Sequence, residues 1–398
     1  MSKISNSTLF PLSSPHRIIV PFVRAEFGGE VFGLTDKYNS FTKVRQSDFI
    51  TGLQVSKYGS GAVNKYTLTM RYVITPETDP NYVDQVISKA QDRKIRFTYG
   101  DLTQPQYSYK DEEGLIENVV PSVDYKRNVI SYTITAVSST QLNYTQKKNF
   151  EKKTAKPSDE ILDILYNNDF GLLELLPGML DRDTVLGNGW IPRGDQKVEI
   201  AEKIGISPID YILYLVSLMK STSGEFYFLK ILDQVGDYGG QHFEIVSTAS
   251  KAAGKMMHIS IGYPGSIPVY DFNVTQNTAI ALMAEYRGKI EKGIYQDYGF
   301  SGDLITKDYY SNETADGRLS DNAKNWWEKI TNYPLVATLT TDGLYVPAEI
   351  VQSVYLDIFF FGKKYNHSGE YLILGQDDNI SKDGYKTTLS LMRIKGDV

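Results

Sequence analysis

Short segments in which apolar and polar side chains alternate recur near both ends of this chain. Residues 65–74 (KYTLTMRYVI) and 129–139 (VISYTITAVSS) are examples from the first part of the sequence. A period of two places successive side chains on opposite faces of a strand, so each segment predicts a strand with one buried face. In the second segment, the residues expected to face the core are Ile130, Tyr132, Ile134 and Ala136.

Residues 1–145 are predicted to form one β domain, a barrel or a sandwich, with a single helix packed on it. The expected strands are 17–27, 50–57, 65–74, 95–101, 115–123 and 129–139. The helix follows the sequence TDP, where Asp79 is suited to cap it and Pro80 to occupy its first turn. Its expected buried face consists of Tyr82, Val83, Val86 and Ile87.

Residues 146–255 are predicted to contain a linker and an inserted mixed α/β domain. The charge-rich stretch 146–160 is interpreted as the linker, which ends in a helix start capped by Ser158. The main helix of the insert is 207–221, with Ser207 at the cap and Pro208 at the first position. A hairpin of residues 225–232 and 242–247 follows it.

Residues 256–335 are predicted to hold connecting strands, a long loop at 288–320 and a helix that carries Trp326 and Trp327. Residues 336–398 return to strands and complete a second β domain. The last hairpin turns at Asp383-Gly384, a dipeptide that suits a positive φ. A faint echo between TLTMR (67–71) and TLSLMR (388–393) suggests that the two β domains are related.

Composition narrows the classes of function. The net charge is −6, of which residues 1–155 contribute +5 (20 Lys+Arg, 15 Asp+Glu) and the remainder −11. Tight nucleic-acid binding needs clustered cations, so a chain this acidic is a poor candidate for it. Absence of cysteine excludes disulfides, thiolate metal sites and Cys nucleophiles. No apolar stretch approaches the roughly 20 residues of a membrane-spanning helix.

Sequence motifs for catalysis are not found. The histidines do not have metal-ligand spacing, and neither a GxSxG elbow nor a GxxxxGK[ST] loop occurs. We therefore predict no catalytic, cofactor-binding or metal-binding residue. The alternative is a carbohydrate-active protein that uses Asp181 and Asp183 as paired carboxylates and stacks sugars on Trp326 and Trp327.

The order of parts over residues 320–398 resembles the C-terminal tube-like domain of phage tail baseplate hub proteins. This family is related to late-control hub proteins and type VI secretion spike hubs. The residues that match its final segment are Ser368, Gly369, Tyr371, Ile373, Ile380, Ser381, Gly384, Tyr385, Thr388, Leu389, Leu391 and Arg393. One departure is that the usual His before the final turn is Asp377 or Asp378 here.

The resemblance implies a mainly β (α+β) fold with two tube-type β-barrel domains, each with a packed helix, and an inserted mixed domain. Hubs of this kind are homotrimers in which paired barrel strands close a ring of pseudo-six-fold symmetry. The implied partners are the tail tube, a central spike or tail-tip protein, the tape measure protein and baseplate wedge proteins. DNA would pass through the lumen without specific binding. Any spike or hydrolase would be a separate polypeptide, because the sequence ends at Val398.

The resemblance therefore implies a non-enzymatic tail hub in the virion, assembled in the host cytoplasm. A hub of a type VI or related contractile injection system is the further alternative. The residues that we expect to mark the second barrel and its assembly are Tyr371, Gly384, Tyr385, Thr388, Leu389, Leu391 and Arg393.

Overall fold

The computed structural model describes most of the chain, in segments. The described residues are 19–34, 49–58, 64–90, 93–103, 108–138, 147–167, 169, 182–187, 191–192, 195–219, 227–232, 242–247, 257–262, 269–276, 335–343 and 352–396. All structural statements below concern these residues.

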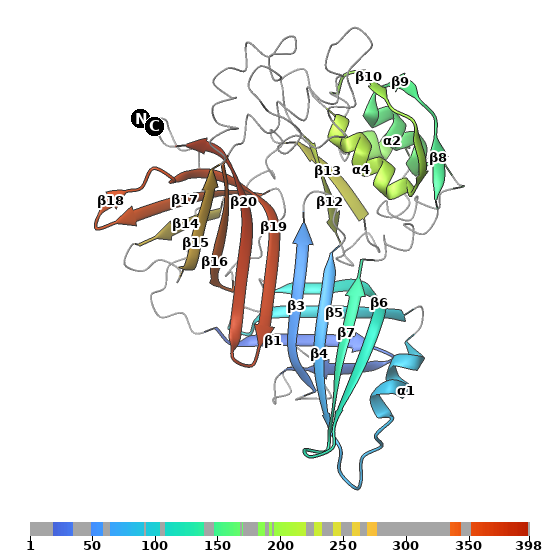
Figure 1. Cartoon of the computed structure of the whole chain (residues 1–398), viewed down its shortest axis with the longest axis vertical. Coiled ribbons are helices and arrows are strands. Elements are labelled where there is room, and N and C mark those ends of the chain that lie inside the picture. The colour runs from blue at the N-terminus through green and yellow to red at the C-terminus, as the bar shows by residue number, and fades with distance from the viewer. Residues whose placement is uncertain are drawn as a thin grey trace, which may run out of the picture.

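Most strands join one large sheet. Its strand order is β15-β16-β20-β19-β3-β4-β7-β6-β5-β1-β2, with β14, β17 and β18 attached through β19. Figure 1 shows the strands from β16 to β6 standing side by side, with the blue and cyan strands next to the red ones. The predicted mainly β fold class is confirmed.

The N-terminal half of the sheet is built from the six predicted strands and from β2, which was not predicted. These are β1 (Pro21–Phe27), β2 (Glu30–Gly33), β3 (Ile50–Tyr58), β4 (Lys65–Val73), β5 (Lys94–Asp101), β6 (Tyr109–Asp124) and β7 (Val129–Val137). In β4 every second side chain from Tyr66 to Tyr72 is buried, as its alternation predicts. In β7 Tyr132, Ile134 and Ala136 are buried, and Ile130 packs partly buried against the same core.

The C-terminal half is also built from strands. These are β14 (Met257–Ile261), β15 (Val269–Gln276), β16 (Leu335–Asp342), β17 (Ser353–Phe360), β18 (Lys363–Lys364), β19 (Gly369–Ser381) and β20 (Gly384–Gly396). Its apolar cluster includes Leu339, Leu356 and Leu389 and is separate from the cluster under the N-terminal strands. Each half thus has a core of its own.

The two halves share one strand order. In the N-terminal half it is β3-β4-β7-β6-β5, and in the C-terminal half it is β15-β16-β20-β19-β17. The long strands β6 and β19 also carry matching bulges, between Ile116 and Asn118 and between Ile373 and Gly375. The pairing of β6 with β5 ends just before the bulge in β6, and the pairing of β19 with β17 ends just before the bulge in β19. A bulge bends a strand and redirects its pairing, so the match extends to local geometry.

This shared order corrects one expectation. The echoing segments 67–71 and 388–393 lie in β4 and β20, but the strand that corresponds to β20 is β7. The echo therefore reflects the general alternation of strands and does not mark equivalent positions.

The helix α1 (Tyr82–Lys89) packs on the N-terminal half, with Val83 and Val86 buried. Its cap differs from the prediction, because the helix begins after Asn81 and has no side-chain cap. Asp79 lies one turn earlier, where its carboxylate accepts hydrogen bonds from the Asn81 amide (2.8 Å) and the Gln85 side chain (2.9 Å).

The middle of the chain forms a separate apolar cluster under α2 (Pro157–Leu165) and α4 (Pro208–Leu218). The other elements of the middle are β8 (Lys148–Phe150), β9 (Lys153–Ala155), α3 (Arg182–Gly187), β10 (Val198–Ile200), β11 (Lys203–Ile206), β12 (Tyr227–Leu232) and β13 (His242–Ser247). The Ser207 cap is confirmed, since its side chain accepts a hydrogen bond from the Asp210 amide (3.1 Å). The hairpin β12–β13 is confirmed as well.

The stretch 146–160 is not a plain linker. It contains β8 and β9, which pair with β11 and β10. Nor is Ser158 the cap of α2, because Lys156 takes that place. Ser158 is instead buried one step inside the helix, where its hydroxyl donates to Asp195 (2.6 Å) and its amide to the same carboxylate (2.9 Å).

Two predicted elements, the loop 288–320 and the helix with Trp326 and Trp327, lie outside the described residues. The predicted domain boundaries, 1–145, 146–255, 256–335 and 336–398, stay predictions.

Candidate assembly site

Eight strands form a continuous antiparallel layer, in the order β15-β16-β20-β19-β3-β4-β7-β6. We call it the eight-strand layer. Its centre is the pairing of β3 with residues 375–381 of β19, which we call the junction. In the described part of the chain, the junction is the one strand pairing that links the N-terminal half to the C-terminal half.

One face of the eight-strand layer covers the two apolar cores, and the other carries mostly hydroxyl and amide side chains. Paired strands place these residues on the same face, for example Gln54 opposite both Thr67 and Asn379. We call this the polar face. Its exposed or half-buried residues include Gln54, Thr67, Thr69, Ser131, Thr133, Thr135, Thr338, Thr340, Asn379, Thr388 and Ser390.

Both ends of the eight-strand layer are open among the described residues. Strand β6 pairs with β5 only up to Leu115, and its residues 118–124 pair with β7 alone. Strand β15 pairs with β16 alone. Apolar side chains lie exposed at these edges, among them Val120, Val123 and Tyr270. An open edge presents unpaired backbone groups, which makes it a template for a further strand.

The two open edges correspond to the two strands of the junction. Residues 118–124 of β6 follow their bulge as residues 375–381 of β19 follow theirs. Strand β15 occupies in the C-terminal half the place that β3 occupies in the N-terminal half. The junction therefore pairs, within one chain, the counterparts of the two open edges.

On the core side of the junction lies a buried polar group of residues, which we call the junction cluster. Lys57 of β3 forms an ion pair with Glu112 of β6 and stands 4.0 Å over the ring of Tyr109. Gln376 donates to Tyr109 Oη (2.7 Å) and to Asp378 Oδ2 (2.6 Å). Its members are Lys57, Tyr66, Tyr99, Tyr109, Glu112, Gln376, Asp378, Tyr385 and Thr387.

Burial raises the pKa of three groups in the junction cluster, Asp378, Tyr99 and Tyr385. Asp378 is fully buried, and this burial raises the pKa of its carboxyl to about 6 against the hydrogen bond from Thr387 (2.6 Å) and the charge of Lys57. Burial, and next the charge of Glu112, raises the pKa of Tyr99 well above its usual value. Burial, and next the charge of Asp378, does the same to the pKa of Tyr385.

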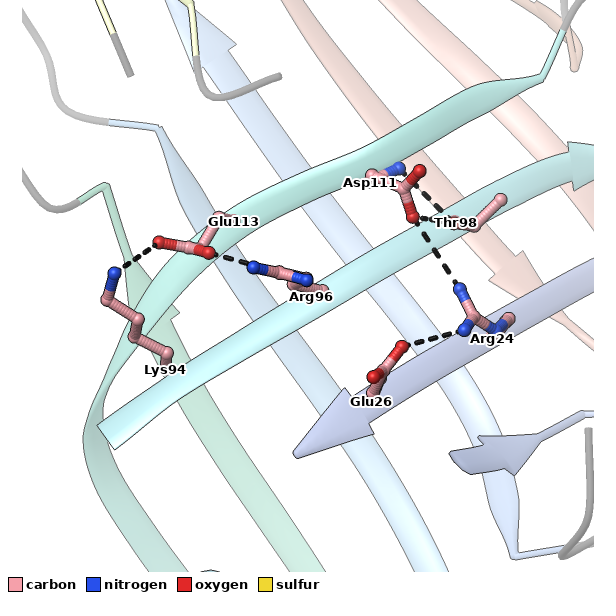
Figure 2. Close-up of polar contacts among 7 residues, drawn as sticks. All are labelled: Arg24, Glu26, Lys94, Arg96, Thr98, Asp111 and Glu113. Carbon is pink, nitrogen blue, oxygen red and sulfur yellow. Dashed lines mark hydrogen bonds and ion pairs between the residues drawn. The ribbon is translucent and has the colours of Figure 1, made fainter. Parts of the chain in front are cut away.

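A second polar group lies along β1, β5 and β6, and Figure 2 shows it as a ladder of charges. Glu113 bridges Lys94 and Arg96 at 3.1 Å each. Arg24 reaches Glu26 (2.7 Å) and Asp111 (3.6 Å). Cations and carboxylates neutralise each other here, so the ladder is not a surface for nucleic acid.

The predicted residues Tyr371 and Arg393 face each other across β19 and β20. The Tyr371 hydroxyl donates to the backbone oxygen of His367 (2.7 Å), and Arg393 donates to the backbone oxygens of Asn366 and Ser368 (3.0 Å each). Together they fasten the turn that leads into β19.

The other predicted residues lie along β20. Leu389 and Leu391 are buried in the core of the C-terminal half, and Thr388 bonds Thr340 (3.1 Å) on the polar face. Gly384 has φ +153°, so the expected positive φ is present, although the turn itself is Lys382–Asp383. Tyr385 belongs to the junction cluster. Their role in assembly stays a prediction.

The alternative carbohydrate site is described in part only. Asp183 is exposed on α3, whereas Asp181, Trp326 and Trp327 lie outside the described residues. Among the described helices, none is both long and apolar enough to cross a membrane.

Sequence reasoning missed the junction cluster, although one signal was present. Lys57 continues the inward phase of Leu53 and Val55, and Asp378 shares the inward phase of Ile380. A charged side chain at an inward position implies a buried partner.

A solved structure has this fold. The 43 kDa tail protein of prophage MuSo2 from Shewanella oneidensis aligns with a TM-score of 0.50 and 12% identity, over 94% of this chain and 97% of that chain. This chain has the fold of a phage tail protein. The similarity to tail proteins expected from residues 320–398 is thus confirmed at the level of the fold.

Two further solved structures align less closely. The tail protein from Neisseria meningitidis MC58 has a TM-score of 0.49 and 8% identity, over 94% of this chain and 96% of that chain. The E. coli c3393 protein, a component of the type VI secretion system, has a TM-score of 0.45 and 9% identity, over 87% of this chain and 74% of that chain. No family model matches this chain, and no curated protein matches it in sequence.

Proposed function

We propose that this chain is the structural hub of a phage tail, a homotrimer whose eight-strand layers join edge to edge into a ring. The observation that carries the proposal is the pair of open edges, residues 118–124 and β15, which correspond to the two strands of the junction. Each chain would pair its β6 edge with β15 of the next chain. Such a head-to-tail contact uses two different surfaces and closes into a ring when the rotation allows it.

The ring would enclose a wide lumen. Three chains with eight strands each supply 24 strands. At about 4.8 Å between strands, and with the tilt that a closed barrel needs, the lumen would be about 30 Å across inside the side chains. A nucleic-acid duplex fits such an opening.

The polar face would line this lumen, since the opposite face of the layer covers the apolar cores. Phosphates are held by clustered cations, and hydroxyl and amide side chains carry no charge. The scattered cations Lys65, Arg71 and Lys386 share the layer with the carboxylates Asp342 and Asp377. The lining therefore suits passage of DNA without tight binding.

In this role the chain has no catalytic site and works in the virion, after assembly in the host cytoplasm. The ring would sit between the tail tube and a central spike or tail-tip protein. The tape measure protein and the baseplate wedge proteins would be its other neighbours. The support for these partners is the tail-protein fold together with the matched segment that contains Tyr371, Tyr385 and Arg393.

Engineered cysteines test the edge pairing directly, because the natural chain has no cysteine. By correspondence with the junction, Ser122 of one chain would lie opposite Asn273 of the next. The double variant Ser122→Cys/Asn273→Cys is expected to form disulfide-linked trimers under mild oxidation, read on a non-reducing gel.

The matched control is Ser122→Cys/Thr338→Cys, because Thr338 lies one strand further in, on β16. We expect this control to stay uncross-linked. Equal cross-linking of both variants, or none in the first, would overturn the edge pairing.

A further inference from the structure

The junction has a polar contact on each side. On the polar face, the Ser56 hydroxyl donates to Asp377. On the core side, the junction cluster places Lys57 of β3 opposite Gln376 of β19. The junction cluster therefore lies directly against the described strand pairing that connects the two halves.

The charges in the junction cluster do not balance when all are ionised. Among the described residues that contact the cluster, Lys57 is the cation, and it pairs with Glu112. Asp378 is then a second buried carboxylate next to a cation that is already paired. A buried charge without a full partner is costly, and taking up a proton removes that cost.

Side chains from several strands surround the carboxyl of Asp378. Thr387 and Tyr385 from β20 and Gln376 from its own strand hydrogen-bond to it. Lys57 of β3 acts on it through its charge, and the charge of Asp378 in turn acts on Tyr99 of β5. Two groups of β6 contact its partners, since Tyr109 bonds Gln376 and Glu112 pairs with Lys57. Apart from Lys57, these groups bring no positive charge.

The side chain of Gln376 can hydrogen-bond to Asp378 in both protonation states of the Asp378 carboxyl. Its Nε2 lies 2.6 Å from Asp378 and 2.7 Å from Tyr109, whereas its Oε1 is buried with no hydrogen-bond partner. If Asp378 is protonated, a half-turn of the amide brings Oε1 to the same place. It then accepts from Asp378 Oδ2–H and from the Tyr109 hydroxyl. Both contacts persist with the direction of their hydrogen bonds reversed, and the buried position without a partner passes from Oε1 to Nε2.

We propose that the junction cluster is a proton-operated lock, in which uptake of one proton by Asp378 tightens the pairing of β3 with β19. The proposal concerns the single chain and does not rest on the ring. The pairing of β3 with β19 is then more stable in acid than near neutral pH.

The sign follows from linkage. The pKa of Asp378 is about 6 in the folded chain and 3.8 for a free carboxyl, so the closed junction binds the proton more tightly than the open one. The stabilisation is fully present below pH 3.8 and is lost as the pH rises through about 6. Between pH 5 and pH 7.5, these two values predict about a tenfold change in the opening equilibrium.

Hydrogen exchange read by mass spectrometry tests the lock on the intact chain. After correction for intrinsic exchange, protection of peptides from β3 and from residues 375–381 is expected to be about tenfold higher at pH 5 than at pH 7.5. Peptides from α4, in another core, serve as the internal control and are expected to show no such change. This comparison needs no variant.

The variant Asp378→Asn is expected to abolish the pH dependence and to keep the high protection at pH 7.5. Its matched control is Asp377→Asn, a change at the next residue, whose side chain lies on the other face of β19. We expect that control to retain the tenfold change. The proposal would be overturned if protection of the junction in the natural chain were the same at pH 5 and pH 7.5. It would also be overturned if Asp378→Asn kept the pH dependence of the natural chain.

Discussion

Phe361 is a residue whose backbone and environment are both unfavourable. It stands at φ +50° in a two-residue turn with Gly362 (φ +80°), between the paired residues Phe360 and Lys363. Two positive φ values in a hairpin turn are typical of type I′, where Asn-Gly is the favoured pair. The Phe361 side chain is also fully exposed, so no packing offsets its strained backbone.

We therefore expect Phe361→Asn to stabilise the chain by about 1 kcal/mol, because Asn adopts the left-handed conformation with less strain. Denaturant unfolding followed by circular dichroism measures the change. The control is Phe360→Asn, whose residue is more than half exposed but does not have a positive φ. A gain in the control equal to that of Phe361→Asn would show that removal of exposed aromatic surface, and not the backbone, is responsible.

At the scale of elements, the proposed ring depends on the open edge strands. Val120 and Val123 are about half exposed on the open edge of β6. Charged side chains on an edge prevent further strands from pairing with it. We expect Val120→Lys/Val123→Lys to leave the far-ultraviolet spectrum unchanged but to lower the mass in solution from about 135 kDa, three times 44.9 kDa, to 44.9 kDa.

Sedimentation equilibrium measures that mass. Val73→Lys is the matched control, because Val73 is equally exposed but lies on β4, inside the layer. A double variant with the natural mass would show that the β6 edge does not hold the assembly together.

The strands could be predicted from the sequence because their cause is local. Alternation from Tyr66 to Tyr72 follows directly from one buried face, and Ser207-Pro208 caps α4 as its residue types indicate. The cap of α1 was misplaced because Asp79 bonds the Asn81 amide and Gln85 and so stabilises the turn before the helix.

The junction could not be predicted, because its strands are more than 300 residues apart in the sequence. Alternation shows that Lys57 and Asp378 point inward, but it does not show that they meet. Nor does it reveal Glu112, which follows a bulge in which Asp111 has φ +51°. Pairing between distant strands depends on the whole fold, and local patterns do not encode it.

At the scale of the whole molecule, the two halves of the large sheet share one strand order. The junction pairs β3 with β19 inside the chain, and the open edges on β6 and β15 repeat that arrangement at its two ends. In the proposed ring, each chain would repeat the junction contact with its neighbour until the ring closes.

Electron cryo-microscopy of the purified full chain is the most direct test of this central claim. We predict a closed ring of three chains, with six similar lobes and a lumen of about 30 Å lined by the polar face. Particles that are single chains, two-fold dimers or open filaments would contradict it.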